Sequence, residues 1–164
     1  ELLLPTIDKI GIPVAGIYRH INNPYINNLV LKIREKCINS KKSFYTPKGK
    51  KSAKDIIQGI KKDTSIVLLI DQKDSAGEKV LFFNYLAKTQ IGFLKISKKH
   101  NLRIVPVQNI RNQNGTFTLK FHKPINKIPE ETSDIQAMTE IHSIVEKWIQ
   151  ENPSDWFLQH NRFS

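Results

Sequence analysis

Two polar segments of this sequence follow directly on apolar runs, at places where strands would end. Asp71 and Gln72 come after the run 66–70, and Arg19 comes after the run 12–18. In an open α/β sheet, ligands bind just beyond the carboxyl ends of the strands. We therefore expect a polar binding site at these strand ends. The alternative is that Asp71 and Gln72 only cap a turn.

The positive charge of the chain is concentrated in residues 32–62. The whole chain has a net charge of +11, and this segment holds eleven Lys and Arg residues but only two acids. A basic surface of this kind attracts phosphates, nucleic acid, an anionic membrane or an acidic protein. A merely solvated basic face is the alternative. Phe44 and Tyr45 beside the lysines give a weak form of the aromatic pattern that nucleic-acid binding needs.

Short apolar runs alternate with amphipathic segments along the chain. We expect strands at 12–18 and 66–70, the second buried on both faces. Asn114-Gly115 predicts a turn before a hairpin strand at 116–121. Helices are predicted after the cap Asn23-Pro24, at 52–62, at 87–99 and after Ser133. This order predicts an α/β fold with a largely parallel or mixed sheet flanked by helices, and no domain linker interrupts it.

The helix that begins at Pro24 carries one apolar stripe, which we expect to face the core. Its members are Ile26, Leu29, Val30, Ile33 and Cys37. Cys37, the single cysteine, is then a buried structural thiol. Arg34 lies on the edge of the stripe and either reaches along the core into a pocket or snorkels outward.

Several kinds of site are missing from the sequence. It has no glycine-rich phosphate loop and no GxSxG elbow, and its five histidines lack metal-ligand spacing. We therefore predict no metal and no cofactor. His100 and His142 occupy polar helical positions, where we expect them to be solvated. No stretch is long and apolar enough to span a bilayer.

Five motifs occur in a specific order and spacing. They are GIYRHINNP (16–24), DQ (71–72), FFNYLAKTQIG (82–92), a helix ending at Pro153, and DWFLQHNRF (155–163). Together they resemble the lipid A biosynthesis acyltransferases, the lauroyl and myristoyl transferases of Gram-negative bacteria. The resemblance covers residues 1–164 and implies a single acyltransferase domain with a glycerolipid-acyltransferase-like fold. His20, Asn84 and Asn161 stand where the family usually has Pro, Gly and Arg.

The resemblance implies acyl transfer from an acyl carrier protein thioester to a hydroxyl of a phosphorylated glucosamine lipid. A hydroxyl needs a base within hydrogen-bond reach, which a histidine oriented by a carboxylate provides. Glu1 matches the carboxylate of the family's H-x4-E/D motif. The histidine would lie five positions before Glu1, so we expect that an N-terminal part is missing and that this chain alone is inactive.

The resemblance also matches Arg34 and Asp71 to charged positions that the family uses near the site. It implies that Arg34 binds lipid phosphate or balances charge and that Asp71 positions Arg34. Arg19 and Gln72 are further candidates for substrate contact. From charge alone, three lysines suit lipid phosphates, the inner membrane surface or the acidic carrier protein: Lys48, Lys50 and Lys51. The implied location is the cytoplasmic face of the bacterial inner membrane, reached through the missing N-terminal segment.

Two other interpretations stay open. A basic module that binds nucleic acid or anionic lipid without catalysis predicts a convex lysine stripe with exposed aromatics and salt-dependent affinity. The acyltransferase interpretation instead predicts that Glu1, Arg34 and Asp71 lie around one cleft with an apolar trough. It predicts no nucleic-acid partner. A family member that keeps the fold and binds lipid without turnover is the third possibility.

Overall fold

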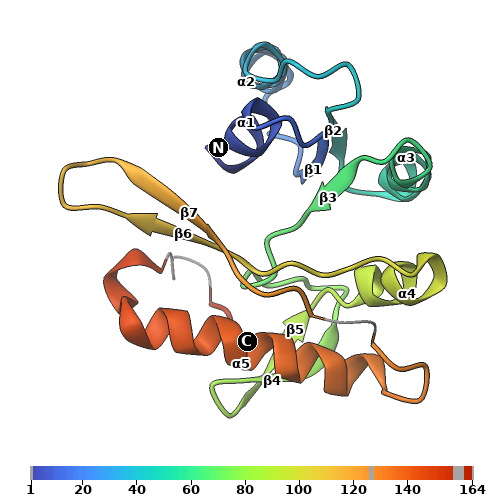
Figure 1. Cartoon of the computed structure of the whole chain (residues 1–164), viewed down its shortest axis with the longest axis vertical. Helices are drawn as coiled ribbons and strands as arrows, with labels where there is room; N and C mark the ends of the chain where they lie inside the picture. Colours follow the sequence, from blue (N-terminus) through green and yellow to red (C-terminus); the bar gives the residue numbers. More distant parts are fainter. Residues whose placement is uncertain (1, 126–127, 157–160, 164) are drawn as a thin grey trace. The chain divides into compact units, whose positions relative to one another are not determined.

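The computed structural model describes residues 2–125, 128–156 and 161–163, apart from the side chains of residues 50 and 51 (Figure 1). The chain divides into two compact units, Glu1–Leu68 and Leu69–Ser164. The described residues form five α-helices and three small sheets, one of them parallel. The predicted α/β class is confirmed. The prediction of a single acyltransferase domain stays a prediction.

A three-stranded parallel sheet forms the centre of the first unit. Its order is β2-β1-β3, with β1 (Val14–Tyr18) between β2 (Phe44–Pro47) and β3 (Ser65–Val67). The connections run through α2 (Pro24–Lys36) and α3 (Lys50–Ile60), and α1 (Leu3–Lys9) precedes β1. Any side chain at Gly16 of β1 would collide with Leu4. The absence of a side chain at Gly16 therefore lets α1 pack directly on β1.

The predicted strand at 66–70 is shorter and more exposed than expected. β3 ends at Val67, and the side chain of Leu69 is 66% exposed. β3 lies at the edge of the three-stranded sheet, so it pairs with β1 on one side only. Ile66 and Val67 of this strand are only half-buried, and the prediction of burial on both faces is wrong. Asp71 consequently lies four residues beyond the end of the strand.

Helix α2 begins where the sequence predicts but turns its apolar stripe outward. The Oδ1 atom of Asn23 accepts hydrogen bonds from the backbone of Tyr25 (2.9 Å) and Ile26 (3.3 Å), which caps the helix. Three stripe residues are about half exposed: Ile26 (49%), Leu29 (59%) and Ile33 (54%). Cys37 is exposed as well. The predictions of a buried stripe and a buried thiol are therefore wrong.

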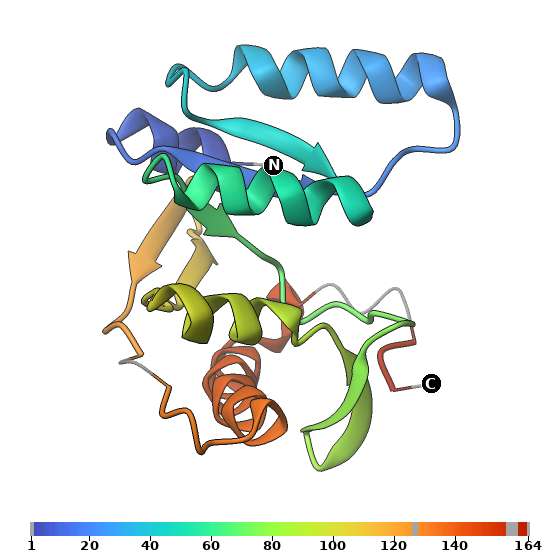
Figure 2. The same cartoon turned by 90° about the vertical axis from the view of Figure 1, so that its right-hand side faces the viewer.

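The second unit combines two hairpins with two helices (Figure 2). β4 (Glu78–Phe82) pairs with β5 (Tyr85–Thr89), and β6 (Val107–Arg111) pairs with β7 (Phe117–Phe121). The helices are α4 (Gly92–His100) and α5 (Asp134–Glu151), and a 3-10 turn, η1 (Pro153–Asp155), follows α5. Their shared core consists of Val80, Leu94, Ile128, Ala137, Met138 and Ile141.

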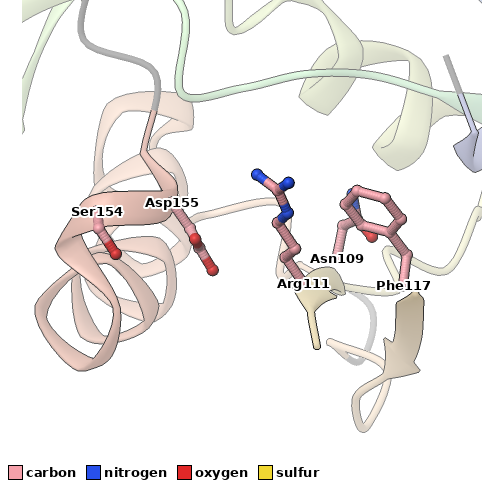
Figure 3. A pocket seen from close by; sticks show the side chains of 5 residues that line it. All are labelled: Asn109, Arg111, Phe117, Ser154 and Asp155. Atoms are coloured by element: carbon pink, nitrogen blue, oxygen red, sulfur yellow. The ribbon is translucent and has the colours of Figure 1, made fainter. Parts of the chain in front are cut away.

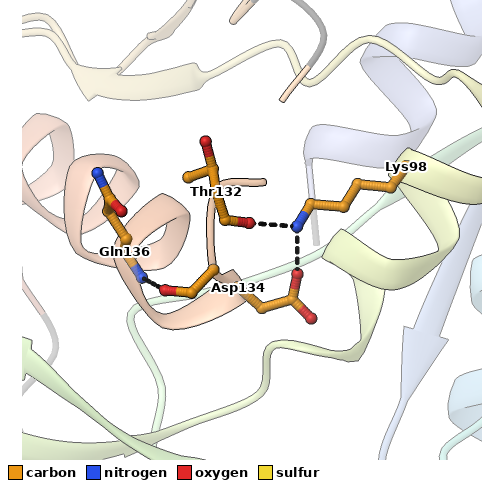
Figure 4. Close-up of polar contacts among 5 residues, drawn as sticks. Lys98, Thr132, Asp134 and Gln136 are labelled. Carbon is orange, nitrogen blue, oxygen red and sulfur yellow. Dashed lines mark hydrogen bonds and ion pairs between the residues drawn. The ribbon is translucent and has the colours of Figure 1, made fainter. Parts of the chain in front are cut away.

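A polar contact fixes the start of α5 against α4 (Figure 4). The Lys98 ammonium group lies 2.8 Å from a carboxylate oxygen of Asp134 and donates to the carbonyl of Thr132 at 2.6 Å. The hydroxyl of Ser133 accepts from the backbone of Gln136, which confirms the predicted cap. No helix in the described ranges is long and apolar enough to cross a membrane.

The helix predicted at 87–99 begins only at Gly92, because residues 85–89 form a strand. Phe83 and Asn84 both have positive φ angles, 51° and 62°, and Phe82 pairs directly with Tyr85. This is the geometry of a two-residue hairpin turn, whose two central residues need positive φ. The turn makes residues 85–89 pair with β4, so the first three residues of the predicted helix belong to a strand instead. Asn tolerates this conformation, so Asn84 can replace the Gly that is usual in the resembling family.

Candidate functional site

The predicted catalytic residues are distributed over both units and beyond the described residues. Glu1 lies outside the described residues. Arg34 belongs to the first unit, whereas Asp71 and Gln72 belong to the second. The predicted positioning of Arg34 by Asp71 therefore stays a prediction. Each unit nevertheless has a polar arrangement of its own around these residues.

In the first unit, two parallel strands end side by side and bring basic residues together. Tyr18, the last residue of β1, pairs with Pro47, the last residue of β2. The carbonyl of Tyr18 then accepts a hydrogen bond from the backbone of Lys48 at 2.8 Å, which keeps the chain after β2 beside the end of β1. We call the residues that follow these two strands the basic edge. Its members are Arg19, Lys48, Lys50 and Lys51.

The start of helix α3 lies within the basic edge. Lys50 and Lys51, which lie just before the helix predicted at 52–62, belong to the first turn of this helix. Gly49 precedes it with a φ of +143°, and the Ser52 hydroxyl accepts from its N–H (3.3 Å) and donates to its carbonyl (2.6 Å). Free backbone N–H groups and the helix dipole make such a helix start favourable for anions. The basic edge therefore combines a helix N-terminus with cationic residues.

The guanidinium group of Arg34 in α2 lies over two tyrosine rings of the sheet. Its guanidinium carbon lies 5.8 Å from the ring centre of Tyr18 and 5.9 Å from that of Tyr45. Arg34 is half-buried, so it neither enters the core nor extends fully into water. Stacking on aromatic rings keeps a guanidinium oriented while it stays charged. Because Tyr18 directly precedes Arg19, this fixed cation adjoins the basic edge.

In the second unit, Asp71 contacts the C-terminal tail. Its Oδ2 atom accepts a hydrogen bond from the indole N–H of Trp156 at 3.2 Å. Burial lowers the pKa of Arg162, and the negative charge of Asp71 opposes that shift. The neighbours of Asp71 within this unit are therefore Trp156 and Arg162, which we did not predict as site residues. Gln72 is exposed.

Arg162 is buried by a cluster of aromatic residues. Its Nη1 donates to the Lys88 carbonyl (2.8 Å) and its Nη2 to the hydroxyl of Thr89 (2.7 Å), while its guanidinium carbon lies 5.2 Å from the ring centre of Phe82. Trp156 and Phe163 also contact the Phe82 ring. We call this the tail cluster: Phe82, Thr89, His142, Trp156, Arg162 and Phe163. Two of the five sequence motifs, 82–92 and 155–163, thus meet in space.

His142 lies inside the tail cluster, so the prediction that it is solvated is wrong. It is fully buried, and its ring centre lies 4.6 Å from that of Phe82. Its Nδ1 lies 2.7 Å from the carbonyl of Leu81 and must carry the proton, because a carbonyl only accepts. Its Nε2 has no hydrogen-bond partner among the described residues.

Burial lowers the pKa of His142. The Leu81 hydrogen bond and nearby Glu146 oppose the shift, while the charge of Arg162 adds to it. The net shift is downward, and His142 is therefore neutral at neutral pH. The sequence does contain a signal for its burial, because His142 adjoins Ile141 and lies four residues after Met138 on the apolar stripe of α5.

A pocket of about 250 Å³ opens in the second unit beside the β6–β7 hairpin (Figure 3). Its lining residues are Asn109, Arg111, Phe117, Ser154 and Asp155. In Figure 3, Arg111 extends from the hairpin across the pocket toward the side on which Asp155 lies. Only one lining side chain is apolar, so this pocket is not the apolar trough expected for an acyl chain.

The part of the chain that the structure describes offers neither a cluster of metal ligands nor fully exposed aromatic rings at residues 44 and 45. No group of three or more His, Cys, Asp or Glu residues there could hold a metal ion. Phe44 and Tyr45 are half-buried rather than exposed. Phe44 lies against α3 at Gly59, and Tyr45 stacks on Arg34. Nucleic-acid bases stack on open aromatic faces, so this use of both rings disfavours the nucleic-acid interpretation.

Comparison with known protein families gives one match. The model of a family described as bacterial lipid A biosynthesis acyltransferase matches residues 1–164, the full length of this chain. No curated protein matches the chain.

Proposed function

Because the chain belongs to the bacterial lipid A biosynthesis acyltransferases, we propose that it is an O-acyltransferase with two specific substrates. The donor is an acyl carrier protein thioester, and the acceptor is a hydroxyl of a phosphorylated glucosamine lipid. The observation that carries the choice of acceptor is the basic edge. It gathers Arg19, Lys48 and the first turn of α3 where β1 and β2 end.

The proposed reaction replaces a thioester by an ester. The acceptor hydroxyl oxygen attacks the thioester carbonyl, the C–O bond forms, and the C–S bond breaks. The hydroxyl proton passes to a base and then to the leaving sulfur, which departs as the carrier protein's thiol. In this proposal Glu1 orients the histidine that the family places five positions before it, and stabilises that imidazole when it is protonated.

The basic edge and Arg34 bind the phosphate group of the acceptor in this proposal. Backbone N–H groups at the start of α3 and the side chain of Arg19 supply donors for its oxygens. Arg34 is already oriented by Tyr18 and Tyr45, so little side-chain freedom is lost when it binds an anion. In the second unit, Asp71 and Gln72 are further proposed substrate-site residues, and the carboxylate of Asp71 accepts a hydrogen bond from Trp156.

The proposed place of action is the cytoplasmic face of the bacterial inner membrane. An acyl lipid acceptor resides in a membrane, whereas an acyl carrier protein is water-soluble and acidic. An enzyme that uses both substrates needs a surface that can contact a membrane and also bind an acidic soluble protein. The excess of positive charge in residues 32–62 suits anionic headgroups and an acidic carrier alike.

The test is acyl transfer by the full-length protein to an acceptor in detergent, with the product identified by mass spectrometry. For Arg34→Ala and Arg19→Ala, we expect the KM for the phosphorylated acceptor to rise by roughly tenfold or more, since a charged hydrogen bond is lost. Lys123→Ala removes an exposed lysine of the second unit and is the matched control.

A dephosphorylated acceptor separates the two anionic substrates. With it, wild type and the Arg34→Ala variant should have similar KM values, because the group that Arg34 contacts is gone. If the variants instead raise the KM for the acyl carrier protein, the basic edge binds the donor and the assignment to phosphate is wrong. If no ester product forms with any acceptor, the proposed reaction itself is wrong.

A further inference from the structure

Helix α2 presents an apolar surface to solvent in the first unit. Tyr25 is 85% exposed, and Ile26, Leu29 and Ile33 are each about half exposed. Asn27 is the residue of this helix that is buried, and its Oδ1 accepts from the backbone of Ile21 at 3.1 Å. The helix thus buries a polar side chain and half-buries Val30 and Leu31, whereas its other apolar side chains are exposed.

The exposed residues form a continuous face. Successive residues of an α-helix turn by about 100° around its axis. Positions 25, 29, 33 and 26 therefore fall within one arc of about 100°, with Lys32 just outside it next to position 25 and Lys36 inside it between positions 25 and 29. Both lysines are exposed. We call this surface the outer face of α2, made of Tyr25, Ile26, Leu29, Lys32, Ile33 and Lys36.

The composition of the outer face is typical of a helix that lies in a membrane interface. Such helices bury an apolar face at the boundary between headgroups and acyl chains, with Lys or Arg beside it. An exposed tyrosine such as Tyr25 favours the same boundary, because its ring is apolar and its hydroxyl is polar. Basic residues also attract anionic headgroups, and the last part of α2 lies in the segment 32–62, whose eleven basic residues and two acids give a net charge of +9.

We propose that the outer face of α2 docks on the surface of an anionic lipid bilayer, with the helix lying along the surface. Leu29 and Ile33 enter the boundary region, and Lys32 and Lys36 contact the headgroups. A second copy of this chain is a poorer occupant, since pairing two outer faces would bring four lysines together without counter-charges. This proposal rests on the proposed function only in the choice of a lipid surface.

The single cysteine provides a direct test. Cys37 is exposed and directly follows α2, so an environment-sensitive fluorophore on its thiol reports on the helix. With vesicles containing about 30% anionic phosphatidylglycerol, we expect a blue shift and quenching by bromine-labelled acyl chains. The control is the same label at Gln113→Cys in a Cys37→Ser background, because Gln113 is exposed in the β6–β7 turn. That label should stay in water.

Variants separate docking by α2 from general charge attraction. We expect Leu29→Ser/Ile33→Ser to weaken vesicle binding roughly tenfold or more, because two apolar side chains no longer leave water. Leu86→Ser removes a side chain of similar exposure (58%) from β5 and should bind as wild type does. If the double serine variant loses helicity by circular dichroism, Lys32→Gln/Lys36→Gln replaces it and should weaken binding to anionic vesicles only.

Several results would overturn the proposal. One is a Cys37 label that stays in water on vesicles, and another is vesicle binding that none of these α2 variants changes. A third is a stable dimer in light scattering whose Cys37 label is shielded without lipid, because the occupant is then protein. The vesicle assay contains neither donor nor acceptor, and acyl transfer is measured in detergent. Failure of docking and failure of the proposed reaction are therefore distinguishable.

Discussion

At the residue scale, two buried ionisable side chains, Asp8 and His142, connect segments that are distant in the sequence. Asp8 accepts hydrogen bonds from the backbone of Asn39 (2.6 Å) and Ser40 (3.3 Å) and from the hydroxyl of Ser43. Ser43 in turn accepts from the backbone of Val14 at 3.0 Å. Helix α1, the loop after α2 and strand β1 are therefore held by one carboxylate.

We expect Asp8→Ala to destabilise the protein by about 2–4 kcal/mol, because three partly or fully buried donors lose their acceptor. The measurement is urea-induced unfolding, with Glu130→Ala as the control because Glu130 is exposed.

Burial alone raises the pKa of Asp8, but its three hydrogen bonds outweigh burial and lower it below the ordinary value. A carboxylate with a lowered pKa stabilises the fold above its unfolded pKa and loses this contribution as pH falls through the folded pKa. Asp8→Asn should lack this acid dependence, and an unchanged one would contradict the assignment.

His142 predicts a pH dependence at milder acidity. Its folded pKa is lowered by burial, so the unfolded chain binds a proton first, at pH values near about 6.5. Stability should therefore decrease as pH falls from about 7 to 5, where protonation would place a second cation beside Arg162. Thermal unfolding at several pH values measures this. His142→Gln should remove part of the decrease, whereas His100→Gln should leave it intact. Equal curves for wild type and His142→Gln would refute the assignment.

At the element scale, the turn between β4 and β5 determines how the second unit is built. Phe83 and Asn84 have left-handed backbone conformations, and the backbone of Phe83 donates to Glu146 of α5 at 2.7 Å. The hairpin buries Val80, Phe82 and Ala87, which face α5 and the tail cluster. Because strand residues alternate between the two faces of a hairpin, this turn selects which side chains become buried.

We expect Asn84→Val to cost about 1–2 kcal/mol of unfolding free energy, because a β-branched side chain is strained at positive φ. Asn84→Gly should be nearly neutral or slightly stabilising, since Gly adopts this conformation without strain. Denaturant titration of both variants provides the measurement, and the exposed Gln113→Val is a control for a surface valine in a turn. An Asn84→Val variant as stable as wild type would mean that the turn has another conformation in solution.

At the scale of the whole molecule, the charges and the buried motifs belong to different units. The basic edge and Arg34 lie in Glu1–Leu68, whereas the tail cluster with Asp71 lies in Leu69–Ser164. The net charge of +11 therefore acts mainly through the first unit. The second unit contains the packed cluster of apolar core residues and the buried Arg162. Binding of anions and stability of the fold should consequently respond to different variants.

We expect affinity for a phosphorylated acceptor to fall steadily as salt is raised from about 0.05 to 0.5 M, because exposed charges are screened. Binding in detergent, followed by calorimetry, measures the dependence. The dephosphorylated acceptor should bind with little salt dependence and is the control. Equal salt dependence for both acceptors would mean that the basic edge does not recognise phosphate.

Much of the local structure follows from the sequence by itself, because caps and turns depend on neighbouring residues. Asn23-Pro24 and Ser133 start helices, and Asn114-Gly115 turns a hairpin, as predicted. The α/β class and the parallel pairing in the first unit also follow, because apolar runs alternate with amphipathic segments. The family follows from motifs that keep their order and spacing, and the family match confirms it.

Only the tertiary structure decided which faces are buried and which side chains meet. An apolar stripe on α2 predicts an amphipathic helix, but burial depends on what packs against it, and here Asn27 faces inward. His142 is buried because α5 packs on β4. Trp156 and Arg162 approach Asp71 through a tail more than 80 residues away in sequence. Sequence patterns encode the period of an element, whereas contacts between distant segments arise only when those elements pack.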